Sequence, residues 1–164
     1  MRRNLLLGLI TLLVAVGACA VPDDDARQAA RQSEVAEKGR AVMPFDLERT
    51  THRFLPTGDG LRQEVVADEV DDAAQVALIR EHLAEEAERF RSGDFADPAR
   101  IHGTAMPGLA ELSAGAAGIA IVYGDLDTGA SLDFRTSDPR LVQALHAWGE
   151  AQVSDHGNHA EPSK

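Results

Sequence analysis

The chain has a single cysteine, Cys19, so its folded part can form no disulfide within the chain. It also lacks an excess of basic residues, because 16 Lys and Arg stand against 27 Asp and Glu, a net charge of −11. A chain of this charge repels nucleic acids and anionic lipids, so we expect no nucleic-acid partner. An acidic surface built for a cationic partner is the alternative to simple solubility.

The short motifs that identify common catalytic sites are also absent. The sequence has no phosphate-binding loop, no G-x-S-x-G, no H-E-x-x-H and no cysteine pair for zinc. Ser154, Asp155 and His156 are the residue types of a catalytic triad. Neighbours on one helical turn point apart, however, and cannot form the chain of hydrogen bonds that a triad needs. An enzyme is therefore the less favoured class.

No apolar run is long enough to span a membrane, but the N-terminus has the pattern of a secretory signal. Arg2 and Arg3 precede an apolar run of about a dozen residues, Leu5 to Val16, whereas a spanning helix needs roughly 20. The residues Val16-Gly17-Ala18-Cys19 resemble the bacterial lipobox. That resemblance implies cleavage before Cys19 and acylation of its thiol, which holds the protein on a membrane. The alternative is an ordinary signal peptide with a chance cysteine.

The composition then divides the chain into four parts. Val35 is the only large apolar residue of a polar, helix-favouring stretch from Ala26 to Lys38, which predicts a solvated tether. The polar residues at the C-terminal end predict a frayed tail. We therefore expect a lipoprotein signal peptide (1–18), a lipidated tether (19–41), one α+β domain (42–156) and a flexible tail (157–164).

Two similar hairpin-plus-helix units fill the expected domain. The predicted strands are 50–55 and 61–67 in the first unit and 119–123 and 131–136 in the second, and the predicted helices are 72–91 and 137–154. Gly60 aligns with Gly129 at an offset of 69, and His82 aligns with His146 at an offset of 64. Either the two units arose by duplication, or they look alike only because any hairpin followed by a helix shares these features.

This order of elements predicts a small, four-stranded, largely antiparallel sheet with helices on one face. Side chains alternate along a strand, so Thr50, His52 and Phe54 should point inward together. The segment between the units is broken by prolines and glycines, and 109–114 should form a short helix. His52 is thereby predicted to lie in the core.

Histidine and methionine are the remaining candidates for chemistry. His102 and Met106 lie four residues apart in a predicted loop, where an imidazole and a thioether can meet. Imidazole suits zinc or copper, and a thioether favours Cu(I). His52 and His146 are the candidates for a further ligand. We therefore predict a transition-metal site, copper first, from these four residues; the alternative is that each only packs or caps the core.

Five segments of the folded part also resemble those of a known family. They are Met43–Leu47, Ile101–Gly103 with Met106–Leu109, and Ala144–Trp148 with Asp155–Gly157. They are similar to small exported bacterial proteins that often carry the name aspartate carbamoyltransferase. True carbamoyltransferases are about twice as long and have a Ser-Thr-Arg-Thr phosphate loop. The nearest string here is Phe134-Arg135-Thr136-Ser137 at a predicted strand end, so we do not expect that activity.

Three classes of function therefore remain. The first is a membrane-anchored envelope lipoprotein with a small binding domain, and a transition metal is its candidate ligand. The second is a small enzyme, which would have a deep pocket with convergent polar groups. The third is a scaffold for another envelope protein, which would have an exposed apolar patch.

Overall fold

The computed structural model describes residues 23–161, which form an α+β fold. The helices are α1 (Asp24–Arg40), α2 (Ala73–Arg91), α3 (Ala96–His102), α4 (Leu109–Gly115) and α5 (Pro139–His156). The strands are β1 (Thr50–Thr57), β2 (Gly60–Ala67), β3 (Ala120–Leu126), β4 (Gly129–Arg135) and β5 (Ala160–Glu161). In this part of the chain no helix is both long and apolar enough to cross a membrane.

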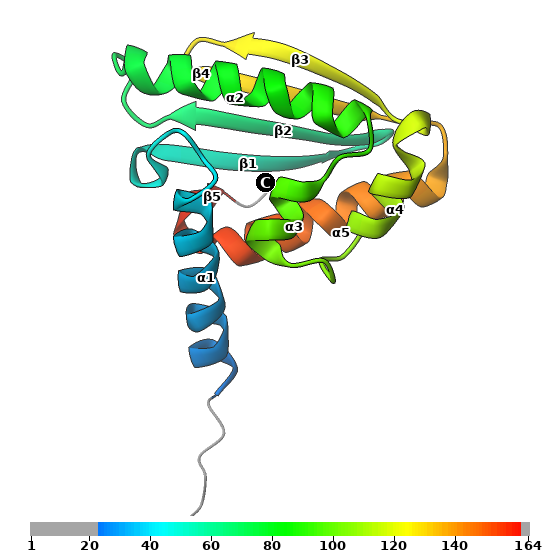
Figure 1. Cartoon of the computed structure of the whole chain (residues 1–164), viewed down its shortest axis with the longest axis horizontal. Coiled ribbons are helices and arrows are strands. Elements are labelled where there is room, and N and C mark those ends of the chain that lie inside the picture. Colours follow the sequence, from blue (N-terminus) through cyan, green and yellow to red (C-terminus); the bar gives the residue numbers. More distant parts are fainter. Residues whose placement is uncertain (1–22, 162–164) are drawn as a thin grey trace, which may run out of the picture.

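The strands form one sheet in the order β3-β4-β2-β1-β5, and all its pairs are antiparallel except β1 with β5. One face of the sheet packs against the helices (Figure 1). The α+β fold, the two hairpins and the largely antiparallel pairing are therefore confirmed, but the sheet has five strands rather than the expected four. Alternation along β1 buries Thr50, His52 and Phe54, as expected. On β4 the fully buried side chains at alternating positions are Ala130, Leu132 and Phe134.

The central pairing of β2 with β4 has an internal two-fold relation. Under the offset of 69, Gln63 corresponds to Leu132, and these two residues stand opposite each other at the centre of the pairing. Gly60 and Gly129 also correspond, and they lie at the two ends of the pairing. The two hairpins therefore meet as symmetric copies of one unit.

The two equivalent glycines are required by the same close approach. A Cβ on Gly60 would lie 1.9 Å from the carbonyl oxygen of Phe134, and one on Gly129 would lie 2.0 Å from that of Val65. Phe134 and Val65 are themselves equivalent under the offset of 69. Only glycine fits at either end, because backbone cannot move away as a flexible side chain can. This shared constraint supports duplication over chance likeness.

The helices correspond at an offset of 66. Asp72 caps the N-terminus of α2, and Asp138 caps that of α5. Arg80 on α2 donates to two carbonyls at the turn of the second hairpin, and His146 on α5 bonds the equivalent two in the first hairpin. The carbonyls are those of Leu126 and Gly129, and of Thr57 and Gly60. Arg80, not His82, is thus the counterpart of His146, and the sequence alignment of the helices was two residues out.

Each helix covers the hairpin of the other unit. The α2 helix packs over β3 and β4, whereas α5 packs over β1 and β2. The units are therefore interlocked, although α2 also touches β2 of its own hairpin.

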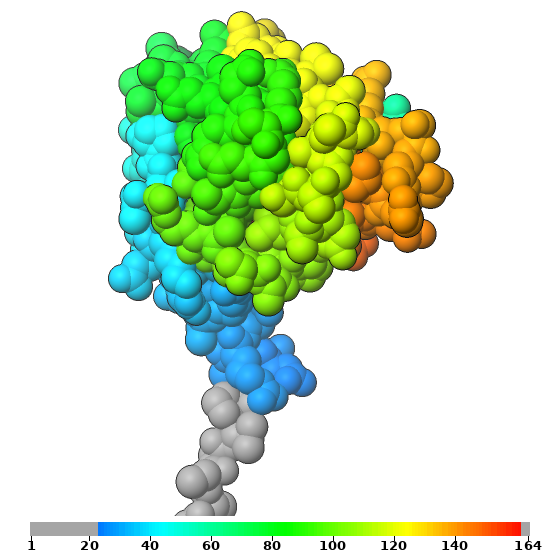
Figure 2. All heavy atoms as spheres, turned by 45° about the vertical axis from the view of Figure 1, so that its right-hand side comes forward, coloured from blue at the N-terminus to red at the C-terminus, as the bar shows by residue number. Residues whose placement is uncertain are grey.

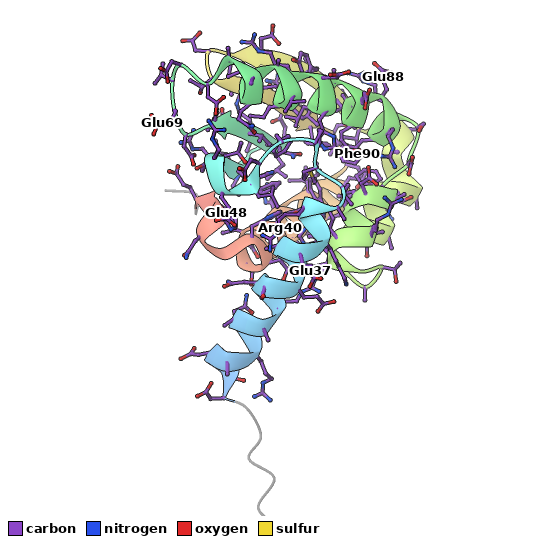
Figure 3. The ribbon with its side chains drawn as sticks, turned by 60° about the vertical axis from the view of Figure 1, so that its left-hand side comes forward. Glu37, Arg40, Glu48, Glu69, Glu88 and Phe90 are labelled. Atoms are coloured by element: carbon purple, nitrogen blue, oxygen red, sulfur yellow. The ribbon has the colours of Figure 1, made fainter. Side chains whose placement is uncertain are left out.

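Charged side chains gather on the outside of this arrangement. Figure 3 shows Glu37, Glu48 and Glu88 directed away from the body, while Phe90 points into it. The outer face of the sheet carries ion pairs, among them Arg62 with Asp133 at 2.8 Å.

The structure differs from the sequence-based expectation in the connecting segment and the tail. The α3 helix was not anticipated, and His102 is its last residue rather than part of a loop. After α5, residues Gly157–His159 form a turn, and β5 pairs with β1 through Ala160 opposite His52. The first five residues of the expected tail are therefore ordered by backbone pairing.

The expected tether also differs, because α1 packs on α5 and α3. Val35, its only large apolar residue, is 1% exposed. Gln28 and Gln32 donate to the carbonyl of Ser154 at 2.6 and 3.0 Å. The beginning of α1 projects from the body (Figures 1 and 2). The part of α1 that carries Gln28, Gln32 and Val35 therefore belongs to the domain.

We predict that Leu83→Ala and Leu145→Ala each lower the free energy of unfolding by about 2–5 kcal/mol. Both side chains are almost fully buried, at 2% and 0% exposure, so each truncation leaves a cavity between a helix and the sheet. Chemical denaturation followed by circular dichroism measures the loss. Val70→Ala is the control, because Val70 is 83% exposed and should change stability by less than about 0.5 kcal/mol. Wild-type stability in both core variants would contradict this packing.

Candidate functional site

An interior cavity of about 30 Å³ lies between the sheet, α2, α3 and α5. Its wall has many polar groups for a space inside a core. Six of its polar residues lie on the sheet, α3 and α5: His52, Gln63, His102, Trp148, Gln152 and His156. They come from β1, β2, α3 and α5, so the cavity exists only when both units are assembled.

The cavity lies where the two helices of the duplicated units face each other. At the helix offset of 66, three pairs of equivalent positions all line it. They are His82 with Trp148, Glu86 with Gln152, and Phe90 with His156. Gln63, at the centre of the β2–β4 pairing, lines it too. The cavity therefore lies at the local two-fold axis, while its chemistry differs between the two halves.

Three buried polar atoms around this cavity have no hydrogen-bond partner within the described chain. They are Nδ1 of His52, Oε1 of Gln63 and Nε1 of Trp148. Leaving a buried donor or acceptor unpaired costs about 1–3 kcal/mol, and most buried polar groups in proteins are paired. Because all three belong to residues that line one cavity, they mark it as a place where a polar ligand or water would be stabilised.

Three imidazole rings are in contact along one side of the cavity. The rings of His52 and His156 stack with centroids 4.9 Å apart and planes 10° apart. His102 meets His156 edge-on at 5.1 Å. His156 also approaches Oε1 of Gln152 with its Nε2 at 3.2 Å. The cluster thus runs from the buried strand β1 to the end of α3.

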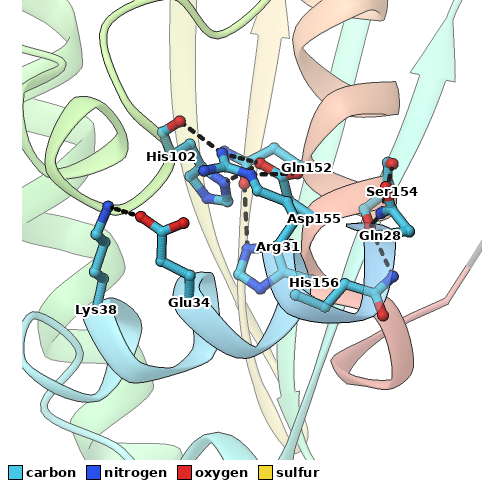
Figure 4. A network of polar contacts seen from close by, with 10 residues as sticks. Gln28, Arg31, Glu34, Lys38, His102, Gln152, Ser154, Asp155 and His156 are labelled. Atoms are coloured by element: carbon cyan, nitrogen blue, oxygen red, sulfur yellow. Dashed lines mark hydrogen bonds and ion pairs between the residues drawn. The ribbon is translucent and has the colours of Figure 1, made fainter. Parts of the chain in front are cut away.

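An ion-pair network fixes the outer end of this cluster (Figure 4). Nδ1 of His102 lies 2.8 Å from Oδ2 of Asp155. Arg31 on α1 donates to both oxygens of Asp155, at 3.1 and 2.6 Å, and to the carbonyl of His102 at 2.6 Å. A carboxylate at Nδ1 fixes the tautomer of the ring and leaves the other nitrogen, Nε2, for a ligand.

Burial keeps the imidazoles of this cluster neutral near pH 7. Burial, followed by the neighbouring histidines, lowers the pKa of His52 to about 4. The same causes lower the pKa of His156 well below its ordinary value. Burial also lowers the pKa of His102, although Asp155 acts in the opposite direction. Burial and then the hydrogen bonds from Arg31 and His102 act on Asp155, and the net result is a lowered pKa.

A second charged group borders the cavity from α2. Glu86 is 6% exposed, and burial raises its pKa to about 7. Arg89 bonds Glu86 at 3.1 Å and also pairs with Asp94 and Asp97. Arg89 therefore holds three carboxylates beside the cavity, and Glu86 is the one that faces it.

The structure brings the predicted ligand residues together in two pairs. His102 and His52 line the cavity, while His102 and Met106 line a separate open groove of about 520 Å³ beside α1. His146 lines neither space and bonds the carbonyls of the first hairpin. Cys19 lies outside the described residues. Among residues 23–161, no group of three or more His, Cys, Asp or Glu side chains is arranged to hold a metal ion.

Sequence reasoning missed Arg31, Gln63 and the roles of the 154–156 segment. The discounted triad types do point apart: Ser154 faces Gln28, and Asp155 faces Arg31. His156, one residue on, stacks inside the core instead. The different directions of these three side chains could be predicted from the sequence, because consecutive residues of a helix point apart. Their partners did not follow from the spacing, because Arg31 lies more than 120 residues away from Asp155.

Comparison with known proteins adds no relative, since no family model, curated protein or solved structure matches the chain.

We predict that acid destabilises the domain between pH 6.5 and 4, because burial lowers the pKa of His156 and His102 as well as that of His52. In this window the unfolded chain protonates a histidine of ordinary pKa, but folded His52 stays neutral down to about pH 4. The unfolded state therefore binds more protons, and unfolding becomes easier as pH falls. The loss from His52 alone is on the order of 3 kcal/mol. Melting temperature against pH, followed by circular dichroism, measures it.

His52→Ile is the matched test, because Ile121 stands at the equivalent buried position of the other unit. This variant should lose part of the acid sensitivity. Glu86 acts in the opposite sense, since its raised pKa favours the folded state below pH 4.5 and this contribution is lost as pH rises through 7. An acid slope in His52→Ile as steep as that of the wild type would contradict the assignment.

Proposed function

We propose that this chain is an exported envelope lipoprotein, anchored through acyl chains on Cys19, whose domain binds a transition-metal ion in the histidine-lined cavity. Copper is the first candidate ion. The observation that carries the binding proposal is that two unpartnered buried atoms able to face an ion, Nδ1 of His52 and Oε1 of Gln63, belong to the lining of one cavity. The third unpartnered atom, Nε1 of Trp148, can only donate, so its partner would be a water bound with the ion. The anchor rests on the lipobox-like residues before Cys19.

The size of the cavity favours an ion over an organic substrate. A buried water needs roughly 10–15 Å³ of such space, so about 30 Å³ accommodates two waters, or an ion with one water. Pockets for organic ligands are usually about ten times larger. A substrate would therefore require the core to open.

The donor set favours copper or zinc among the ions. Imidazole nitrogens suit both metals, and the neutral ring is the form that binds. Asp155 orients His102 in the manner of a carboxylate behind a metal-bound histidine. The rings of His52 and His156 are nearly parallel, so one of them must turn for their nitrogens to meet at one ion.

The same Asp155–His102 pair would also orient a general base, and this favours an enzyme as the second candidate. The small cavity limits its substrate to a molecule of a few atoms. A scaffold has less support. Over residues 23–161 the only large apolar side chains that are exposed are Val70 and Val122.

Anchoring is tested by Cys19→Ser. We expect this variant to remain uncleaved or to be released in soluble form, because no thiol is left to carry the acyl chains. Membrane fractionation and intact mass measure the outcome. Unchanged fractionation and mass would show that the cysteine is not lipidated.

Metal binding is tested by anaerobic titration of the whole chain with Cu(I) against a competing chelator. We expect saturable binding, and an affinity at least about tenfold lower in His102→Ala and in His52→Ile, because each removes a ligand nitrogen. His146→Arg is the control. Arg80 already makes the same two carbonyl bonds in the other unit, so this variant should keep both the fold and the affinity. No binding, or equal binding by every variant, would leave the cavity as a site for buried water.

A further inference from the structure

The open groove beside α1 meets the cavity at one residue. Its lining includes Arg31, Met106, Pro107, Ala151 and Asp155, and its volume is about 520 Å³. Within residues 23–161, His102 alone lines both the groove and the cavity. The His102 side chain, only 2% exposed, therefore lies between the groove and the cavity.

We propose that this groove is the way into the cavity, that Met106 and His102 bind the ion there first, and that Arg31 holds the passage closed. This inference rests on the proposed metal-binding function. It assigns Met106 to an outer position on the route rather than to the final site. It also gives α1 a role beyond attachment.

The outer position has the chemistry for a soft ion. Met106 supplies a thioether, and His102 supplies an imidazole at the same groove. A thioether favours Cu(I) over zinc, whereas the cavity lining offers imidazole and amide groups to an ion. An ion held between Met106 and His102 would reach His156 by a turn of the His102 ring, because these two rings are in contact.

The Arg31 side chain is placed to oppose that turn. It binds the main chain of His102 and the carboxylate that holds the ring of His102, so α1, α3 and α5 are joined at one point. Arg31 can leave without unfolding the core, because α1 buries only Val35 and Gly39. Its departure would free His102 to move between the groove and the cavity.

The chain contains its own reporter for arrival in the cavity. Trp148 is the only tryptophan, and its indole lines the cavity. Copper bound there should quench its fluorescence. Rapid mixing of the whole chain with chelated Cu(I) under anaerobic conditions thus gives two signals. Chelator absorbance reports capture of the ion, and tryptophan fluorescence reports its arrival inside.

In the wild type we expect capture to precede quenching. Met106→Leu should slow capture about tenfold with little change in the final affinity, and Ala105→Phe, which fills the exposed end of the groove, should slow it too. Arg31→Ala should speed both arrival and release about tenfold, because a hydrogen bond to a charged group is worth roughly that factor. The rates of arrival and release in Arg31→Lys should lie between those of the wild type and those of Arg31→Ala. The control is Arg27→Ala, whose partner on α1 is the exposed Asp24.

The outcomes separate the two proposals. If the wild type shows no saturable Cu(I) binding, the proposed function is wrong, and this inference falls with it. If the wild type binds Cu(I) but Met106→Leu and Ala105→Phe load at its rate, the groove is not the way in. If Arg31→Ala changes affinity without changing the rates of arrival and release, Arg31 positions His102 and does not close the passage.

Discussion

The antiparallel pairing of β2 with β4 is the contact on which the rest of the structure depends. It brings backbone so close at Gly60 and Gly129 that a single added carbon would meet a carbonyl oxygen at either end. That pairing joins the two hairpins into one sheet, and each helix then crosses to cover the other hairpin. The space between the helices is the cavity. A change at either glycine would therefore disturb the sheet, the helices and the candidate site together.

The backbone is close to symmetric around this pairing, but the polar groups are not. His52 stands where the other hairpin has Ile121, and His156 stands where the other helix has Phe90. The elements without a counterpart, α1 and α3, add Arg31 and His102 on the same side. Buried polar groups destabilise a core unless they are paired. Their gathering around one cavity is what separates a functional interpretation of this cavity from ordinary packing.

The sequence predicts the local elements of this fold well. Turn residues and alternation located both hairpins and placed His52 inward, and helix caps and apolar spacing located α2 and α5. The sequence-based prediction failed where contacts between residues far apart in the chain determine the structure. The strand β5 is too short to show a pattern and forms only because β1 offers an edge. The helix α1 looked solvated because it docks through Arg31 and glutamines rather than through an apolar face. His82 was aligned with His146 because they are the same residue type, whereas the capping residues Asp72 and Asp138 give the true register. The partners of His102 could not be foreseen, since they come from both ends of the chain.

Because each helix covers the hairpin of the other unit, the two units depend on each other for burial. One unit alone would have a two-stranded hairpin with no helix over it and a helix with no hairpin beneath it, and such a hairpin is at best marginally stable. A single unit could bury its hairpin and its helix only by pairing with a second copy, in which every position would occur twice. Within one chain the two copies can differ at equivalent positions. His52 of the first copy stands opposite Ile121 in this comparison, and His156 of the second stands opposite Phe90, a combination that no symmetric dimer could have.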